Sequence, residues 1–132
     1  MEISTVIAEF QCGAERVWNI VTSLTEYAWR SDLDRIEILS ENRFVEYSKD
    51  GFATAFTITV NERCKRWEFD LDNVNIFGHW SGVFTEKDGR TMIEFTENIT
   101  AKKLFMKPFV KGFLKKQQAR YVEDLKKALS EI

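Results

Sequence analysis

Apolar and polar positions change their spacing along the chain, and each change predicts a different element. Residues 2–10 alternate between two faces, which predicts a strand. Residues 14–24 carry apolar side chains at helical spacing and predict a helix that ends near residues 23–25. Thr25 is placed to cap a second short helix that continues through Tyr27 and Trp29.

From Asp34 to Thr100 the spacing changes to alternation, which predicts six further strands. The segments Lys49-Asp50-Gly51 and Lys87-Asp88-Gly89 predict tight turns, because Asp-Gly tolerates the positive φ that hairpin turns need. Strands that follow one another through such turns pair antiparallel.

Residues 103–130 return to helical spacing and predict one long C-terminal helix. Because a proline cannot sit deep in a helix, Pro108 predicts that the helix begins or kinks there. Phenylalanines and lysines each recur every four residues, on opposite sides of the helix. We therefore expect four of the apolar side chains to be buried against the sheet: Phe109, Phe113, Leu125 and Leu129.

These elements predict one α+β domain over residues 1–132, in the order strand, two helices, six strands, long helix. A sheet of about seven strands needs a cover for its apolar face, and the long C-terminal helix is the element that can supply it.

Four short segments in this order resemble the START-like superfamily, also called SRPBCC or the polyketide cyclase/dehydrase group. They are Ala14-Glu15-Arg16-Val17-Trp18, Leu24 to Arg30, Gly78-His79-Trp80 and Gly89-Arg90-Thr91. The chain departs from the family near Tyr27, where members often have a proline and a wider Tyr-to-Trp spacing.

The resemblance implies a helix-grip fold, in which a curved antiparallel sheet wraps around the C-terminal helix and encloses a cavity. It also implies several functions, because family members bind sterols, lipids, polyketides, ubiquinone-like molecules or plant hormones. Some members are cyclases or hydrolases, and others are protein adaptors. A shared fold does not choose among these functions.

Aromatic side chains are the strongest candidates for a ligand site. Alternation places six side chains on one face: Phe56, Ile58, Trp67, Phe69, Trp80 and Phe84. The pattern fits either a packed core or an aromatic-lined cavity, and the resemblance favours the cavity. Gly82 is expected to leave room on that face, while Phe113 and Tyr121 are expected to line the cavity from the helix.

Glu97 falls on the same face as Ile93, Phe95 and Ile99. Either it lies at a strand end and reaches water, or it is buried with a partner such as Arg120 or Tyr121. A buried Glu97 would be a polar anchor for a ligand or a general acid/base.

Other chemistry finds little support in the sequence. His79 is the only histidine and alternates outward, so we expect no metal site, no catalytic constellation and no cofactor. Cys12 and Cys64 are expected to be buried free thiols, and no secretion signal or membrane span is visible, which favours a cytoplasmic protein.

The net charge is −2, but it is unevenly distributed, with a basic stretch in residues 102–132 and an acidic remainder. We interpret the lysines as a solvated helix face and expect neither nucleic-acid binding nor stable membrane insertion. The favoured function is binding of a small apolar or amphipathic ligand by a monomer or homodimer. The alternatives are a cyclase/dehydrase- or hydrolase-type enzyme and a protein-binding adaptor.

Overall fold

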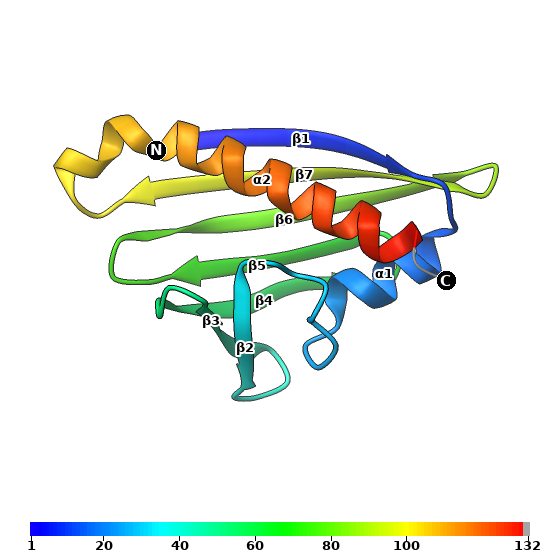
Figure 1. The fold of residues 1–132 in the computed structure, drawn as a ribbon, viewed down its shortest axis with the longest axis horizontal. Helices are drawn as coiled ribbons and strands as arrows, with labels where there is room; N and C mark the ends of the chain where they lie inside the picture. The colour runs from blue at the N-terminus through cyan, green and yellow to red at the C-terminus, as the bar shows by residue number, and fades with distance from the viewer. Residues whose placement is uncertain (131–132) are drawn as a thin grey trace.

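One antiparallel sheet of seven strands forms the body of the protein in its computed structural model, which describes residues 1–130. The strand order across the sheet is β1-β7-β6-β5-β4-β3-β2, so β1 and β2 form its edges (Figure 1). The strands are β1 (Glu2–Phe10), β2 (Leu33–Ile38), β3 (Arg43–Ser48), β4 (Ala53–Glu62), β5 (Arg66–Asp72), β6 (Ile76–Lys87) and β7 (Arg90–Ala101).

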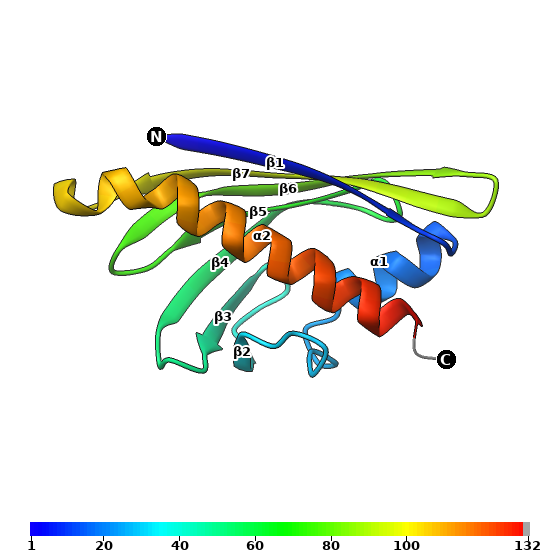
Figure 2. The ribbon, with the colours of Figure 1, turned by 45° about the horizontal axis from the view of Figure 1, so that its top comes forward.

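Two helices and one short turn of 3-10 helix complete the fold: α1 (Ala14–Thr22), η1 (Leu104–Met106) and α2 (Lys107–Ser130). The long helix α2 crosses the sheet and packs against β1 and β7 (Figures 1 and 2). Helix α1 packs against β6 and β7, near the C-terminal end of α2. Pro108 is the second residue of α2, where a missing backbone N–H breaks no helical hydrogen bond. The α+β helix-grip architecture is therefore confirmed. Within residues 1–130, no helix is both long and apolar enough to span a membrane.

The expected second short helix through Tyr27 and Trp29 is wrong. Residues 23–32 form bends and turns instead. Ser23 rather than Thr25 binds the local backbone, because its hydroxyl accepts hydrogen bonds from the N–H groups of Thr25 and Glu26. This loop then places Arg30 against β3, where it makes ion pairs described below.

Register divides the sheet into an inner face, toward α2, and an outer face. On β7 the buried side chains alternate strictly from Thr91 to Ala101, and their cross-strand partners on β1 and β6 point the same way. Phe56, Ile58, Trp67, Phe69, Trp80 and Phe84 all lie on this inner face, as the alternation predicted.

The face of α2 that packs on the sheet differs from the predicted one. Phe109 and Phe113 are 71% and 55% exposed, so the expectation that they are buried is wrong, whereas Leu125 and Leu129 are buried as expected. The buried row consists of Val110, Leu114, Gln118, Leu125 and Leu129. None of these five side chains is charged. The side of α2 that carries Phe109 and Phe113 continues through Lys116 and Arg120, so packing that side on the sheet would bury two cations.

A pair of truncations tests which face holds the helix. Leu125→Ala removes a side chain that is 0% exposed, and we expect it to lower the free energy of unfolding by about 2–5 kcal/mol. Phe113→Ala truncates a larger but exposed ring and is expected to cost less than about 0.5 kcal/mol. Denaturant unfolding measures both, and a larger loss for Phe113→Ala would contradict this packing.

Candidate functional site

The inner face of the central strands is the candidate site, because α2 does not cover it completely. Phe69 and Ile58 lie in the middle of the sheet on the inner face, yet both are only partly buried. The reason is that α2 packs on β1 and β7, at one side of the sheet. Apolar side chains on β4 and β5 are thus accessible beside the helix.

A connected set of aromatic rings runs from these strands to α2. The rings of Phe69 and Trp80 stack with centroids 4.8 Å apart, and Phe56 meets Phe69 edge-on at 4.9 Å. Trp80 then contacts Tyr121 of α2, with centroids 6.2 Å apart. Such offset and edge contacts are favourable for aromatic rings and hold them in place. Ile58, Phe69, Trp80, Glu97 and Tyr121, with Trp29 and Arg30 of the preceding loop, are called the inner-face cluster below.

Three of the residues predicted to line the site lie elsewhere. Trp67 and Phe84 pack edge-on against Trp18 of α1, with centroids 5.9 and 5.1 Å away, and so belong to the core beneath α1. Phe113 is exposed on the far side of α2 and does not point toward the sheet. The predicted set therefore divides among the core beneath α1, the exposed side of α2 and the inner-face cluster, which Phe56 contacts through Phe69.

The room expected above Gly82 is filled by its neighbours. A Cβ atom at Gly82 would lie 3.0 Å from Cη2 of Trp80 and 3.6 Å from Cε1 of Phe84. The missing side chain thus makes space for the Trp80 indole rather than for a ligand. Any ligand on the inner face must lie against these rings, not inside a void at Gly82.

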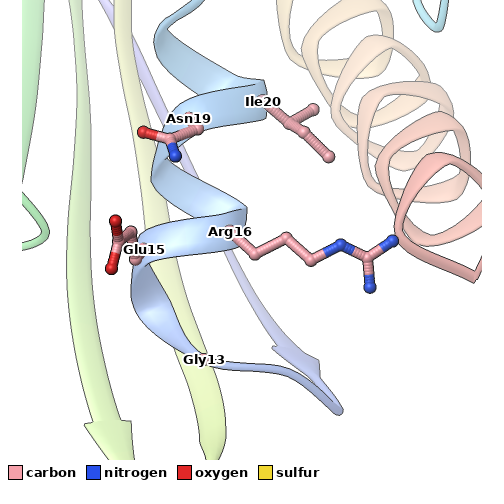
Figure 3. A pocket seen from close by; sticks show the side chains of 5 residues that line it. All are labelled: Gly13, Glu15, Arg16, Asn19 and Ile20. Carbon is pink, nitrogen blue, oxygen red and sulfur yellow. The ribbon is translucent and has the colours of Figure 1, made fainter. Parts of the chain in front are cut away.

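Two surface hollows lie away from the inner-face cluster. One, of about 560 Å³, is lined by α1 residues, with Arg16 and Ile20 directed toward α2 and Glu15 and Asn19 away from it (Figure 3). The other, of about 550 Å³, lies on the outer face beside His79 and Lys102. Both are open and shallow, and neither is lined by the predicted aromatic residues.

Glu97 is the buried acid of the inner-face cluster. It stands on β7 between Ser4 of β1 and Trp80 of β6 and is 8% exposed, so it is largely buried and does not lie at a strand end. Within residues 1–130 its carboxyl group makes no hydrogen bond or ion pair. Burial raises the pKa of Glu97 to about 7, although the nearby Arg30 guanidinium acts in the opposite direction. At neutral pH this carboxyl group exists in both protonation states.

Arg30 is the cation that faces Glu97, in place of the expected Arg120, which is exposed. Its guanidinium binds Asp32 and Glu46, with N···O distances of 3.1–3.2 Å. Burial alone would lower the pKa of Arg30, but the two carboxylates raise it, so the guanidinium stays charged. Asp32 and Glu46 accept four hydrogen bonds from the five N–H donors of Arg30, and the effect of Arg30 on Glu97 is that of its charge.

Trp29 and Tyr121 bring two further polar atoms to the cluster. Their rings meet edge-on at 5.4 Å, and the Arg30 guanidinium lies 5.5 Å from the Tyr121 ring centre. The indole Nε1–H of Trp29 is buried and has no hydrogen-bond partner in the described chain. Burial also raises the pKa of the Tyr121 hydroxyl, which therefore stays protonated. A buried donor without a partner is rare and costly, so the cluster has unused hydrogen-bonding capacity.

The sequence did not predict that Trp29 and Arg30 belong to this site, or that Glu46 holds Arg30 there. The alternation of β3 did carry a signal, since Glu46 shares a face with Phe44. An acid at such an inward position requires a partner, and a nearby basic residue was the one to seek. What the pattern could not supply was the path of the loop that carries Arg30.

His79 lies on the outer face, as its alternation predicted. Its two ring nitrogens lie 2.7 Å from carboxylate oxygens of Asp70 and Glu68. Although its partial burial alone would lower the pKa of His79, these two carboxylates raise it. Nothing in residues 1–130 groups three or more His, Cys, Asp or Glu side chains as a metal site would need.

The comparisons with known proteins agree with this fold. A family model described as "Polyketide cyclase / dehydrase and lipid transport" matches residues 1–130. No curated protein matches the chain.

Solved structures share the fold at low sequence identity. A START superfamily protein from Mycobacterium smegmatis matches with a TM-score of 0.89 at 11% identity, covering 98% of this chain and 97% of that one. The Zhui aromatase/cyclase from a Streptomyces species matches with a TM-score of 0.87 at 8% identity, covering 98% and 93%. A conserved protein from Geobacillus kaustophilus matches with a TM-score of 0.83 at 12% identity, covering 98% and 96%. At these identities the likeness concerns the fold alone.

The raised pKa of Glu97 predicts how stability depends on pH. Because this pKa lies above the ordinary value of 4.5, the contribution of Glu97 to stability is greatest below about 4.5 and is lost as pH rises through about 7. Glu97→Gln removes the ionisation and keeps the shape. The variant should gain about 3 kcal/mol in stability relative to the unmodified protein as pH rises from 4 to 8.

Denaturant unfolding across this pH range measures the effect, and Glu94→Gln serves as the control. Glu94 precedes Glu97 on β7 but points to the outer face and is exposed. A difference between Glu97→Gln and the unmodified protein that does not change with pH would show that Glu97 is not desolvated.

Proposed function

Because the chain belongs to the polyketide cyclase/dehydrase and lipid transport family, we propose that its inner-face cluster binds a small, flat, apolar or amphipathic molecule. The observation that carries this proposal is the combination of accessible rings with unused polar groups. Phe69 and Ile58 are only partly buried, and beside them Glu97 and Trp29 Nε1 make no hydrogen bond within residues 1–130. An apolar surface with a few converging polar groups is the usual form of a small-molecule site.

The rings favour a flat ligand. Phe69 and Trp80 are parallel to within 1°, and the partly exposed Phe69 ring offers a planar molecule a surface to lie against. The rings are held by their own contacts, with Trp80 fixed between Phe69, Phe95 and Tyr121. Little side-chain freedom is lost on binding, which favours affinity.

The charges favour a ligand whose polar group is neutral. Arg30 is balanced by Asp32 and Glu46, and Glu97 adds a third carboxyl group. A carboxylate ligand would bring another negative charge into a site with an excess of acids. A hydroxyl or ketone group can instead exchange hydrogen bonds with Glu97, the Tyr121 hydroxyl and the Trp29 indole N–H.

Dye displacement tests the binding proposal. An environment-sensitive hydrophobic dye is expected to brighten with the native protein and to be displaced by 2-naphthol more readily than by 2-naphthoate. Phe69→Ala and Tyr121→Leu should each weaken 2-naphthol binding by about tenfold, since each removes a ring or a polar partner from the site. Isothermal titration gives the affinities.

Phe77→Ala is the matched control, because Phe77 is a partly exposed phenylalanine on the outer face of β6. Equal losses for Phe69→Ala and Phe77→Ala would place the dye on the surface and contradict the proposal.

Proton transfer within the same site is a second candidate function, and the state of Glu97 favours it. A buried carboxyl group with a pKa of about 7 can accept or donate a proton near neutral pH, as cyclisation or dehydration of a carbonyl compound requires. Tyr121, which stays protonated, could donate a hydrogen bond to the carbonyl oxygen of such a substrate. The relative described as an aromatase/cyclase shares the fold and makes this chemistry worth testing.

The test follows deuterium exchange at the carbon beside the ketone of 2-tetralone by NMR. If Glu97 is a general base, the protein-catalysed rate should rise as pH increases through about 7, because the ionised form is the active one. Glu97→Gln should abolish that rate and leave 2-tetralone binding within about twofold. Exchange that survives in Glu97→Gln would exclude this role and leave the binding proposal untouched.

A further inference from the structure

The end of the molecule formed by η1 and the first half of α2 exposes large apolar side chains. Leu104, Phe105, Phe109 and Phe113 are 79%, 73%, 71% and 55% exposed. In both views this segment lies at the extreme left of the protein, at the opposite end of α2 from α1 (Figures 1 and 2). These four side chains and the lysines among them, at positions 103, 107, 111, 115 and 116, are called the basic aromatic end.

No acidic residue balances the lysines of this end. The sequence from Asn98 to Val122 contains no Asp or Glu, and the first turn of α2 has no acidic residue. Lys102 pairs with Asp72, but the five lysines of the basic aromatic end make no ion pair within residues 1–130. Lys116, three residues after Phe113, lies on the same side of α2 as the exposed rings, whereas Lys107, Lys111 and Lys115 lie toward the opposite side. The end as a whole therefore carries both exposed rings and uncompensated positive charge.

This arrangement is unfavourable for the isolated fold. Cations near a helix N-terminus oppose the helix dipole, and Lys103 and Lys107 stand at the start of α2. Exposed phenylalanines leave apolar area in water, and their number here exceeds the isolated surface phenylalanines elsewhere, such as Phe52 and Phe77. Neither feature contributes to the packing of α2, which depends on the row from Val110 to Leu129.

We propose that the basic aromatic end docks on the surface of an anionic lipid bilayer, with its phenylalanine rings at the acyl boundary and its lysines among the phosphates. A helix that presents aromatic side chains together with lysines binds such interfaces by burial of apolar area and by electrostatic attraction. Charge complementarity selects this occupant, because the lysines need anions and the rings need an apolar layer next to them.

Other binding partners would suit either the exposed rings or the lysines, but not both. A second copy of the chain could cover the phenylalanines, but an interface between two such ends would bring their lysines together. A nucleic-acid duplex would neutralise the lysines but would leave the rings without an apolar partner.

Sedimentation with vesicles tests the proposal on the full chain. The protein should co-sediment with phosphatidylcholine vesicles that contain about 30% phosphatidylserine and remain in solution with phosphatidylcholine alone. Raising the salt from about 0.1 M to about 0.5 M should weaken binding, because the lysine contribution is screened. Failure to bind the anionic vesicles at low salt would overturn the proposal.

Two variants separate the rings from the charges. The triple variant Phe105→Ser, Phe109→Ser and Phe113→Ser should weaken vesicle binding by about tenfold or more, because it removes the inserted apolar area. Lys111→Glu with Lys116→Glu should weaken it to a similar extent and flatten the salt dependence. The matched control is Phe52→Ser with Phe77→Ser, which changes exposed phenylalanines outside this end and should bind normally.

Unfolding midpoints and analytical ultracentrifugation complete the experiment. All variants change exposed residues and should keep the unfolding midpoint, so a loss of vesicle binding reports on the surface. A dimer that the phenylalanine triple variant dissolves would show that a second copy covers the rings and would overturn the proposal. So would equal vesicle binding by the triple variant and the control. Neither result bears on 2-naphthol binding by the inner-face cluster, which lies on the opposite side of α2.

Discussion

A buried pair of hydrogen bonds between Ser4 and Gln118 fixes where the long helix lies on the sheet. The Ser4 hydroxyl donates to Oε1 of Gln118 at 2.7 Å, and Nε2 of Gln118 donates to the Ser4 carbonyl at 2.9 Å. Both residues are almost fully buried, so neither amide nor hydroxyl has water as an alternative partner. This pair specifies the position of α2 over the edge strand β1 in a way that the surrounding leucines alone would not.

The position of α2 then determines the character of the inner face. Gln118 lies above β1, so Tyr121, almost one turn later, reaches Trp80 and Phe95 on β6 and β7. Helix α2 does not extend over the middle of β4 and β5, and Phe69 stays partly accessible there. Helix α2 therefore covers only one side of the wide sheet. The accessible rings of the inner-face cluster follow from that offset rather than from a void in the core.

Much of this fold could be predicted from the sequence because strand alternation is a strong signal. Alternation identified the shared face of Phe69 and Trp80 and the inward direction of Glu97, since each strand presents side chains to two faces only. The helix was harder, because a cylinder offers several apolar stripes. Four-residue spacing favoured Phe109 and Phe113, and only the charges further along that stripe argued against them.

The candidate site was less predictable than the fold, because it depends on contacts between distant segments. The loop of residues 23–32 contributes Trp29 and Arg30, and its path depends on Asp32 and Glu46 rather than on any local periodicity. Arg120 was a reasonable partner for Glu97 on sequence grounds, since it neighbours Tyr121 on the helix. A neighbouring position along a helix points about 100° away, however, and that rotation directs Arg120 to solvent.

The two halves of α2 differ in charge, and the second half connects the helix to this loop. Asp124 accepts hydrogen bonds from the backbone N–H and the hydroxyl of Ser31, at 2.9 and 2.8 Å. Ser31 lies between Arg30 and Asp32, so Asp124 in the second half of the helix holds the segment that supplies charge to Glu97. The first half of α2 carries four lysines and no acidic residue. The acids of α2 within residues 1–130 therefore belong to the half that contacts the loop, whereas the first half offers only positive charge.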